Sequence, residues 1–191
     1  MEYKKFLVIG GSRGIGRDII NHFKGESLSR SNGYDITNSP SRKKIAHISL
    51  NYDVVVNHAY CGDFSQTLML KDLCDLWIEK KKKGYIINTG SMSSYRFNGK
   101  KDEKWWLMSA VKTGQDQYIN YLSHGAAWRK EINFRITNVR PGMLDTERGR
   151  QKPHFKTGIR GEDYCQLIEY LLSTPEDLII SEIILEAKCH H

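Results

Sequence analysis

The chain has 191 residues, which is enough for one domain with a well-buried core. Hydrophobic residues make up 39% and charged residues 27%, a balance that is typical of globular proteins and argues against intrinsic disorder. The formal net charge is +7, but basic and aromatic residues do not alternate as they do in nucleic-acid stacking surfaces. We therefore expect no nucleic-acid partner, and a basic surface that attracts an anionic cofactor.

The hydropathy pattern favours a cytoplasmic protein without membrane contact. No apolar run approaches the roughly 18 residues that span a bilayer, and the first residues lead into a short strand rather than a signal peptide. The widely spaced cysteines are Cys61, Cys74, Cys165 and Cys189. Because they form no Cys-x-x-Cys pair, the spacing argues against a zinc site and a disulfide framework. We expect reduced cysteines and no bound metal.

Strands and helices alternate along the chain. The β-branched run at 53–57 is the clearest strand, and apolar stripes mark helices at 15–23 and 66–82. In chain order we expect a strand at 5–9, a helix at 15–23 ended by Gly25, a weak strand at 27–29, a helix from 38 or 39 to about 48, a strand at 53–57, a helix at 66–82, a strand at 84–89, a polar loop at 91–104, a helix at about 108–129, a strand at 134–139, a helix at 162–172 and a strand at 181–186. This alternation predicts an α/β fold with a Rossmann-type doubly wound parallel sheet, helices on both faces and three layers, as a single domain over residues 1–191.

A glycine-rich turn lies between the first predicted strand and the first predicted helix. Its glycines at Gly10, Gly14 and Gly16 follow the spacing GxxxGxG. Glycines let the backbone turn tightly and approach a phosphate, and the following helix start supplies free N–H groups with a partial positive charge. The strand before the turn and the helix after it strengthen the motif, which predicts a pyrophosphate site.

Further motifs follow in order along nearly the whole chain: Asp35-Ile36-Thr37, Asn57-His58-Ala59-Tyr60, Ile86-Ile87-Asn88-Thr89-Gly90-Ser91, Ser109-Ala110-Val111-Lys112, Arg135-Ile136-Thr137-Asn138-Val139-Arg140-Pro141-Gly142 and Asp145-Thr146. Together with the glycine spacing, this series resembles the short-chain dehydrogenase/reductase family. The resemblance implies an oxidoreductase that binds NAD(P)(H) and acts on a small carbonyl, alcohol or enone substrate. It also implies a homo-oligomer that pairs through the helices at about 66–82 and 108–129.

The resemblance assigns site residues to positions that match the family motifs. Ser91 is expected to orient the substrate carbonyl, and Lys112 to bind the cofactor ribose. The cofactor-binding residues that it implies are Gly10, Ser12, Arg13, Gly14, Ile15, Gly16, Arg30, Asp35, Ile36, Asn57, His58, Ala59, Lys112, Pro141, Gly142, Met143 and Thr146.

Two arginines favour NADP(H) over NAD(H). Arg13 lies inside the glycine loop and Arg30 follows the short second strand, where the family carries basic residues in NADP-dependent members. A guanidinium pairs a phosphate through charge-assisted, bidentate hydrogen bonds. An NAD-dependent protein has a carboxylate near Arg30 to accept a hydrogen bond from the ribose hydroxyl, and the sequence has none there.

The family's proton-donating tyrosine is missing. Its position, four residues before Lys112, is Met108, and the longer spacing used by some enoyl reductases leads to Trp105. Neither a thioether nor an indole acts as a proton donor in general acid catalysis. Substitute donors are conceivable, but each has a more ordinary interpretation as a packing, loop or surface residue: His58, Tyr60, Tyr95, Lys101 and Lys104.

Two functions therefore stay open at the sequence level. The first is an NADP-dependent oxidoreductase with an altered proton relay, favoured by Ser91, Lys112 and the loop at Pro141-Gly142. The second is a catalytically inactive NADP(H)-binding sensor or partner-binding protein, favoured by Met108 and by the short segment between Tyr60 and the helix at 66–82, where the family's catalytic asparagine helix is cut down.

Overall fold

A six-stranded parallel sheet forms the centre of the part of the chain that the computed structural model describes, residues 4–94, 103–128, 130–152 and 155–188. The strands are β1 (Phe6–Ile9), β2 (Glu26–Leu28), β3 (Val54–Asn57), β4 (Gly84–Thr89), β5 (Phe134–Pro141) and β6 (Glu182–Leu185), in the order β2-β1-β3-β4-β5-β6. Every neighbouring pair is parallel. The predicted doubly wound parallel sheet is confirmed.

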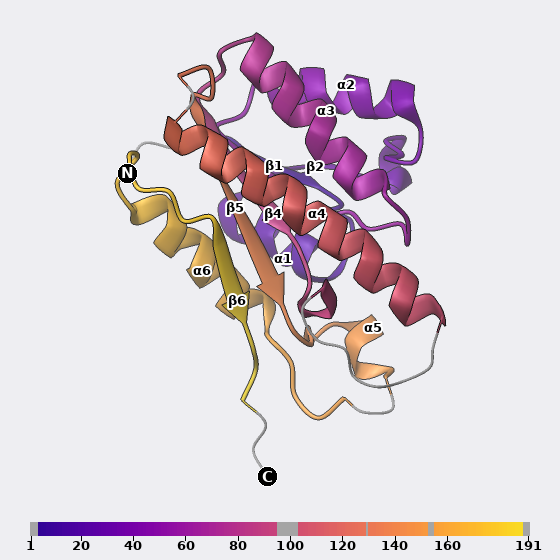
Figure 1. The fold of residues 1–191 in the computed structure, drawn as a ribbon. Coiled ribbons are helices and arrows are strands. Elements are labelled where there is room, and N and C mark those ends of the chain that lie inside the picture. The colour runs from indigo at the N-terminus through magenta and orange to yellow at the C-terminus, as the bar shows by residue number, and fades with distance from the viewer. Residues whose placement is uncertain (1–3, 95–102, 129, 153–154, 189–191) are drawn as a thin grey trace.

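Helices cover both faces of this sheet, which gives the three predicted layers (Figure 1). The helices are α1 (Gly14–Phe23), α2 (Ser39–Ser49), α3 (Ser65–Glu79), α4 (Glu103–Trp128), α5 (Glu147–Arg150) and α6 (Gly161–Ser173), with the single 3-10 turns η1 (Arg30–Asn32) and η2 (Met92–Ser94). α2, α3 and α4 lie on one face, and α1 and α6 on the other. None of these helices, within the described ranges, combines the length and apolarity that crossing a bilayer requires.

Two hydrophobic cores form because side chains alternate along each strand. On β1, Leu7 and Ile9 belong to the core beneath α2, α3 and α4, whereas Phe6 and Val8 belong to the core beneath α1 and α6. All four are buried. Strands buried on both faces read as continuous apolar runs, which is why 5–9 and 53–57 gave clear strand signals.

Helix α4 begins earlier than the sequence indicated. It starts at Glu103 instead of about Met108, so Trp105 and Met108 belong to the helix rather than to a loop and its edge. The stretch that precedes Met108 is polar and aromatic, but no glycine or proline interrupts it, and the helix extends backwards through it.

The end of α1 also differs from the expectation. The left-handed residue is Lys24, with φ 52°, rather than Gly25. Gly25 is needed for a different reason, because a Cβ there would lie 2.8 Å from the Cβ of Phe6. The short elements α5, η1 and η2 had no sequence prediction, since a single turn is too short to show hydrophobic periodicity.

Candidate cofactor and active site

A large cleft opens at the carboxyl ends of β1 and β3. The chain leaves β1 toward β2 on one side and returns as β3 on the other, which is the switch point where doubly wound sheets bind ligands. The cleft has a volume of about 1300 Å³. Typical small-molecule pockets measure roughly 300–1000 Å³, so the cleft has room for a ligand of dinucleotide size.

The glycine loop forms the floor of this cleft. Gly10 has φ 95°, and a Cβ there would lie 2.7 Å from the backbone of Ala59. A Cβ on Gly16 would lie 2.5 Å from the carbonyl oxygen of Gly10. The two glycines therefore allow β1, β3 and the start of α1 to approach one another closely.

The N-terminus of α1 fits a pyrophosphate. Its N-cap residue is Arg13, whose side chain makes no capping hydrogen bond, and the first turn carries no acidic residue. The first N–H groups of the helix are thus left for an anion from outside the helix. Thr146 packs against the loop: its Cγ2 would lie 3.3 Å from a Cβ on Gly14.

Most of the residues expected to bind the cofactor line this one cleft. They are Gly10, Ser12, Arg13, Gly14, Ile15, Arg30, Asp35, Ile36, His58, Ala59, Lys112, Pro141, Gly142, Met143 and Thr146. Gly16 and Asn57 do not line it. Gly16 packs beneath the loop, and Asn57 is fully buried in the sheet.

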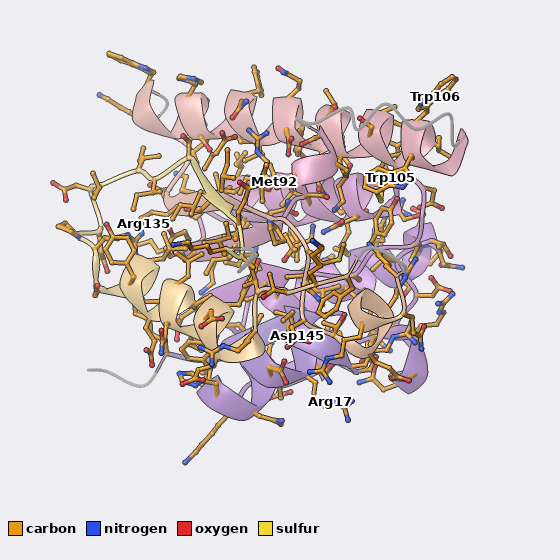
Figure 2. The ribbon with its side chains drawn as sticks, turned by 90° about the horizontal axis from the view of Figure 1, so that it is seen from below. Arg17, Met92, Trp105, Trp106, Arg135 and Asp145 are labelled. Atoms are coloured by element: carbon orange, nitrogen blue, oxygen red, sulfur yellow. The ribbon has the colours of Figure 1, made fainter. Side chains whose placement is uncertain are left out.

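Cationic side chains gather where the cleft passes η1 and the start of α1. Arg13, Arg17 and Arg30 line it, and none of them forms an ion pair with another described residue. Figure 2 shows Arg17 at the edge of the molecule. The carboxylate of Asp35 accepts hydrogen bonds from the backbone N–H and hydroxyl of Thr37, which lower its pKa, with the charge of Arg30 adding to the effect.

Asn57 begins a row of buried amides that crosses three strands. Asn57, Asn88 and Asn138 lie in register on β3, β4 and β5. The Nδ2 of Asn57 donates to Asn88 Oδ1 at 2.9 Å, and Asn88 Nδ2 donates to Asn138 Oδ1 at 2.9 Å. Asn138 Nδ2 donates to the carboxylate of Asp116 at 2.6 Å. Because a carboxylate only accepts, Asp116 fixes the direction of the whole row.

Lys112 reaches the cleft from α4 but directs its ammonium group inward. Its Nζ donates to Gln66 Oε1 at 2.6 Å, to the carbonyl oxygen of Thr89 at 3.0 Å and to Gln115 Oε1 at 3.3 Å. The residue is 5% exposed. Burial lowers the pKa of Lys112 to about 7, against the opposing charge of Asp116. All three donors of the ammonium are used inside the protein.

Ser91 lies at the mouth of the cleft beside η2. Its Oγ accepts hydrogen bonds from the backbone N–H of Ser93 at 3.1 Å and from the Ser93 hydroxyl at 2.8 Å. Its own hydroxyl proton stays available to a ligand in the cleft. Met92, which follows it, is buried beneath the cleft wall.

His58 is held by a hydrogen-bonded chain that runs into the core. Its Nδ1 lies 3.0 Å from Thr89 Oγ1, which in turn lies 3.0 Å from the hydroxyl of Tyr164. Burial, and then the charge of Lys112, lower the pKa of His58 to about 4. The imidazole is therefore neutral near pH 7 and has no imidazolium proton to give to a substrate.

Solved short-chain dehydrogenases and reductases resemble the chain over nearly its whole length. A 3-ketoacyl-(acyl-carrier-protein) reductase from Brucella melitensis, complexed with NADH, has a TM-score of 0.74 at 15% identity, covering 95% of each chain. A short chain dehydrogenase from Burkholderia cenocepacia, in complex with NADP, has a TM-score of 0.73 at 14% identity, covering 98% of this chain and 90% of the other. A betaketoacyl-[ACP] reductase from Bacteroides thetaiotaomicron has a TM-score of 0.70 at 21% identity, covering 96% and 97%. Comparison with protein-family models and with curated proteins finds no match.

The chain has the short-chain dehydrogenase/reductase fold. The resemblance inferred from the motifs is thus shown at the level of architecture.

Within this fold, Met108 lines the cleft one turn of α4 before Lys112. Trp105 lines it as well, whereas Trp106 is 53% exposed, so the two neighbouring tryptophans face different surroundings. Figure 2 shows Trp105 on the inner side of α4 and Trp106 on its outer side. No side chain at the family's tyrosine position can donate a proton.

Tyr60, one of the residues considered as substitute donors, lies close to Lys112. The Lys112 Nζ lies 4.9 Å from the centroid of the Tyr60 ring, and Tyr60 lines the cleft. Burial raises the pKa of Tyr60, while the charge of Arg148 lowers it. Tyr95 and Lys101 lie outside the described residues, as does the side chain of Lys104.

Some functional positions had no sequence signal. Gln66 holds Lys112 and also donates from Nε2 to the carbonyl oxygens of Asn57 and Thr89, each at 3.0 Å. Arg148 and Lys152 line the cleft from α5 and the turn after it. These contacts depend on the tertiary arrangement, since the residues are far apart in the chain. Cys61, Cys74 and Cys165 are free, and no group of potential metal ligands occurs among the described residues.

Proposed function

We propose that the chain is an NADP(H)-dependent oxidoreductase of the short-chain dehydrogenase/reductase type, acting on a small carbonyl, alcohol or enone through an altered proton relay. The observation that carries the proposal is a single cleft that joins the uncapped start of α1 to Ser91 and Lys112. A bound nicotinamide cofactor gives or accepts a hydride. The protein's own part is to hold the cofactor, orient the substrate and handle a proton.

The glycine loop and the α1 N-terminus support a dinucleotide. Both the free N–H groups and the close approach permitted by Gly10 suit a pyrophosphate. The NADH complex of the Brucella melitensis reductase and the NADP complex of the Burkholderia cenocepacia protein support a nicotinamide cofactor. Those two complexes do not distinguish NADP from NAD.

The preference for NADP(H) rests on Arg13 and Arg30. Both line the cleft and neither forms an ion pair with a carboxylate among the described residues. The nearby Asp35 carboxylate is already engaged by Thr37. Two free guanidinium groups suit a ribose phosphate better than a ribose hydroxyl.

Tyr60 is the best-supported proton donor. A phenol is protonated at neutral pH, and the ring of Tyr60 lies beside Lys112 in the cleft. Ser91 can donate its hydroxyl proton to a carbonyl oxygen, because its Oγ accepts from Ser93. Proton donation from a positioned group contributes roughly 10²–10⁴-fold in rate.

A second function is favoured by the orientation of Lys112. Its three donors are satisfied by Gln66, Thr89 and Gln115, which leaves none for a ribose hydroxyl without loss of an internal hydrogen bond. Together with Met108, this supports an NADP(H)-binding sensor or partner-binding protein without turnover.

Cofactor choice is tested by titrating NADPH and NADH against the protein and following nicotinamide fluorescence. We expect Arg30→Ala to weaken NADPH binding about tenfold or more and to leave NADH binding nearly unchanged. Lys43→Ala is the matched control, because Lys43 is an exposed cation on α2 that does not line the cleft. Equal losses for the two cofactors would contradict the NADP(H) preference.

Turnover separates the two functions. NADPH oxidation is measured against a panel of aldehydes, ketones and enones. The reduced product is also quantified, and its amount should equal the amount of NADPH consumed. We expect turnover that Tyr60→Phe lowers at least about 10²-fold without a change in the dissociation constant of NADPH. Binding of NADPH with no oxidation across the panel would favour the sensor.

We also propose that two copies pair through α3 and α4. Large apolar side chains are exposed on these helices or at their ends: Phe64, Leu68, Trp106, Leu107, Tyr121 and Trp128. Exposed apolar surface of this kind is typical of interaction sites. Light scattering after size exclusion is expected to give a dimer or larger assembly, and Tyr121→Glu with Trp128→Glu to shift it to a monomer; a monomeric wild-type protein would contradict this.

A further inference from the structure

Two cations in the segment after β5 face the cleft without a partner. Arg148 in α5 and Lys152 just after it line the cleft, and the side chain of neither forms a hydrogen bond or ion pair with another described residue. Arg150 in the same segment pairs with Asp145, and Arg160 pairs with Asp163. Arg148 and Lys152 are therefore the cations of this segment that line the cleft, and neither is neutralised by a carboxylate among the described residues.

These two cations are close enough to affect each other. Burial lowers the pKa of Lys152, and the charge of Arg148 lowers it further. Both residues keep solvent-exposed surface. Like charges placed close together repel each other, and an anion bound beside both relieves the repulsion. The acidic residues that line the cleft with them do not provide it: Glu147 forms no ion pair with another described residue, and Glu186 has a partner of its own.

The pair lies beside the groups of the proposed reaction. The charge of Arg148 acts on the phenol of Tyr60, whose ring lies 4.9 Å from the Lys112 ammonium. Trp105 and Met108 line the cleft from α4, and α5 lies near the same N-terminal end of that helix (Figure 1). Arg13 and Arg30, which suit the cofactor phosphates, belong instead to the glycine loop and η1.

We propose that Arg148 and Lys152 form a binding site for the anionic group, a carboxylate or a phosphate, of a carbonyl substrate. This inference rests on the proposed oxidoreductase function, because it names the substrate class of that cleft. The guanidinium of Arg148 offers a planar fork that matches carboxylate and phosphate oxygens, and the Lys152 ammonium adds a mobile point charge. With its charge held there, the substrate's carbonyl lies within the same cleft as Ser91 and Tyr60.

The test compares ligands that share a carbonyl and differ in charge. Pyruvate, acetoacetate and levulinate are each titrated against their methyl esters, and dihydroxyacetone phosphate against dihydroxyacetone, with binding to the NADP-loaded protein followed by ligand-detected NMR. We expect at least one anionic ligand to bind about tenfold tighter than its neutral partner. The carboxylate and phosphate arms identify the source of the anion.

The variant Arg148→Ala/Lys152→Ala is expected to remove this preference and to leave the neutral ligands and the dissociation constant of NADPH unchanged. Arg150→Ala is the control, since Arg150 lies in the same helix, is exposed, does not line the cleft and already pairs with Asp145. It is expected to behave like the wild type.

The outcomes keep this inference apart from the oxidoreductase proposal. If no anionic ligand is preferred, or if the double variant loses NADPH binding as much as anion binding, the anion site is overturned and the pair belongs to the cofactor site. A charge preference that persists in the wild type without any NADPH oxidation upholds the anion site, while the oxidoreductase proposal fails.

Discussion

The Nζ of Lys112 lies 2.6 Å from the Oε1 of Gln66, and this hydrogen bond joins α4 to the start of α3 above the ends of β3 and β4. The amide of Gln66 is oriented by two carbonyl acceptors, Asn57 and Thr89, so its oxygen has to face the lysine. The lysine that the motif assigned to a ribose is therefore also a structural element of the cleft wall.

A double-mutant cycle on this pair should reveal strong coupling. Lys112→Met leaves the Gln66 oxygen buried without a donor, and Gln66→Met removes an acceptor from a buried ammonium, each at about 1–3 kcal/mol in the free energy of unfolding. The double variant should lose less than the sum, by about 0.5–3 kcal/mol, measured by urea denaturation. The control cycle uses Lys71 and Asp75, an exposed ion pair on α3, for which coupling below about 0.5 kcal/mol is expected. Additive losses at Lys112 and Gln66 would contradict the coupling.

Gly10→Ala should weaken both the fold and cofactor binding. The new Cβ would lie 2.7 Å from the Ala59 backbone, at a residue with φ 95°. Gly33→Ala is a matched control, because Gly33 has φ 90° but nothing within 4 Å of its Cβ position. Gly33→Ala should therefore show only the backbone strain, about 1 kcal/mol, and Gly10→Ala distinctly more. Thermal unfolding and NADPH titration measure the two effects, and equal losses would show that the Ala59 contact is unimportant.

Asn88→Ala should destabilise the protein by about 2–4 kcal/mol, because it removes the donor to Asn138 Oδ1 and one of the two acceptors of Asn57 Nδ2, which keeps only the carbonyl oxygen of Gln66. The exposed Asn51 provides the control, and Asn51→Ala is expected to stay within about 0.5 kcal/mol of the wild type. Denaturant titration at neutral pH measures both. A loss at Asn88 as small as the loss at Asn51 would mean that water or local relaxation replaces the row of amides.

Protein stability should decrease on acidification in a window set by His58. Its pKa is 6.5 as a free side chain and about 4 in the folded protein, so the unfolded chain binds the proton first. The contribution of His58 is complete above about pH 6.5 and is lost as the pH falls toward 4, by at most about 3 kcal/mol. Urea denaturation between these pH values should show a smaller slope for His58→Asn than for the wild type. His47→Asn, at an exposed histidine on α2, should keep the wild-type slope.

Met108→Tyr should raise turnover if the cleft carries out hydride transfer. It introduces a phenol one helical turn before Lys112 in a residue that lines the cleft. We expect about a 10²-fold increase in kcat for carbonyl reduction at an unchanged dissociation constant of NADPH. Leu107→Tyr adds the same phenol at the preceding residue, which is 56% exposed and does not line the cleft, and should change nothing. No gain at Met108 would favour the sensor.

The sequence predicted the layers of the fold because strands buried on both faces and amphipathic helices leave strong local patterns. The boundaries of the elements were predicted less accurately, as the start of α4 at Glu103 and the left-handed Lys24 illustrate. The first residues of α4 show no apolar periodicity that marks the helix start, and a left-handed lysine is recognised only from the backbone. The glycine loop could be predicted from the sequence because phosphate binding requires glycine at fixed spacing between a strand and a helix.

The architecture and the set of residues that gather at the cleft follow from the amino-acid sequence, since order along the chain fixes which strand ends meet. How those residues are used depends on their contacts in the folded protein. Asn57 and Gly16 pack inside the protein rather than line the cleft. Lys112 donates a hydrogen bond to Gln66, and Arg148 and Lys152 line the cleft. Hydrogen-bond partners and burial depend on contacts between segments far apart in the chain, and no local sequence pattern encodes these contacts.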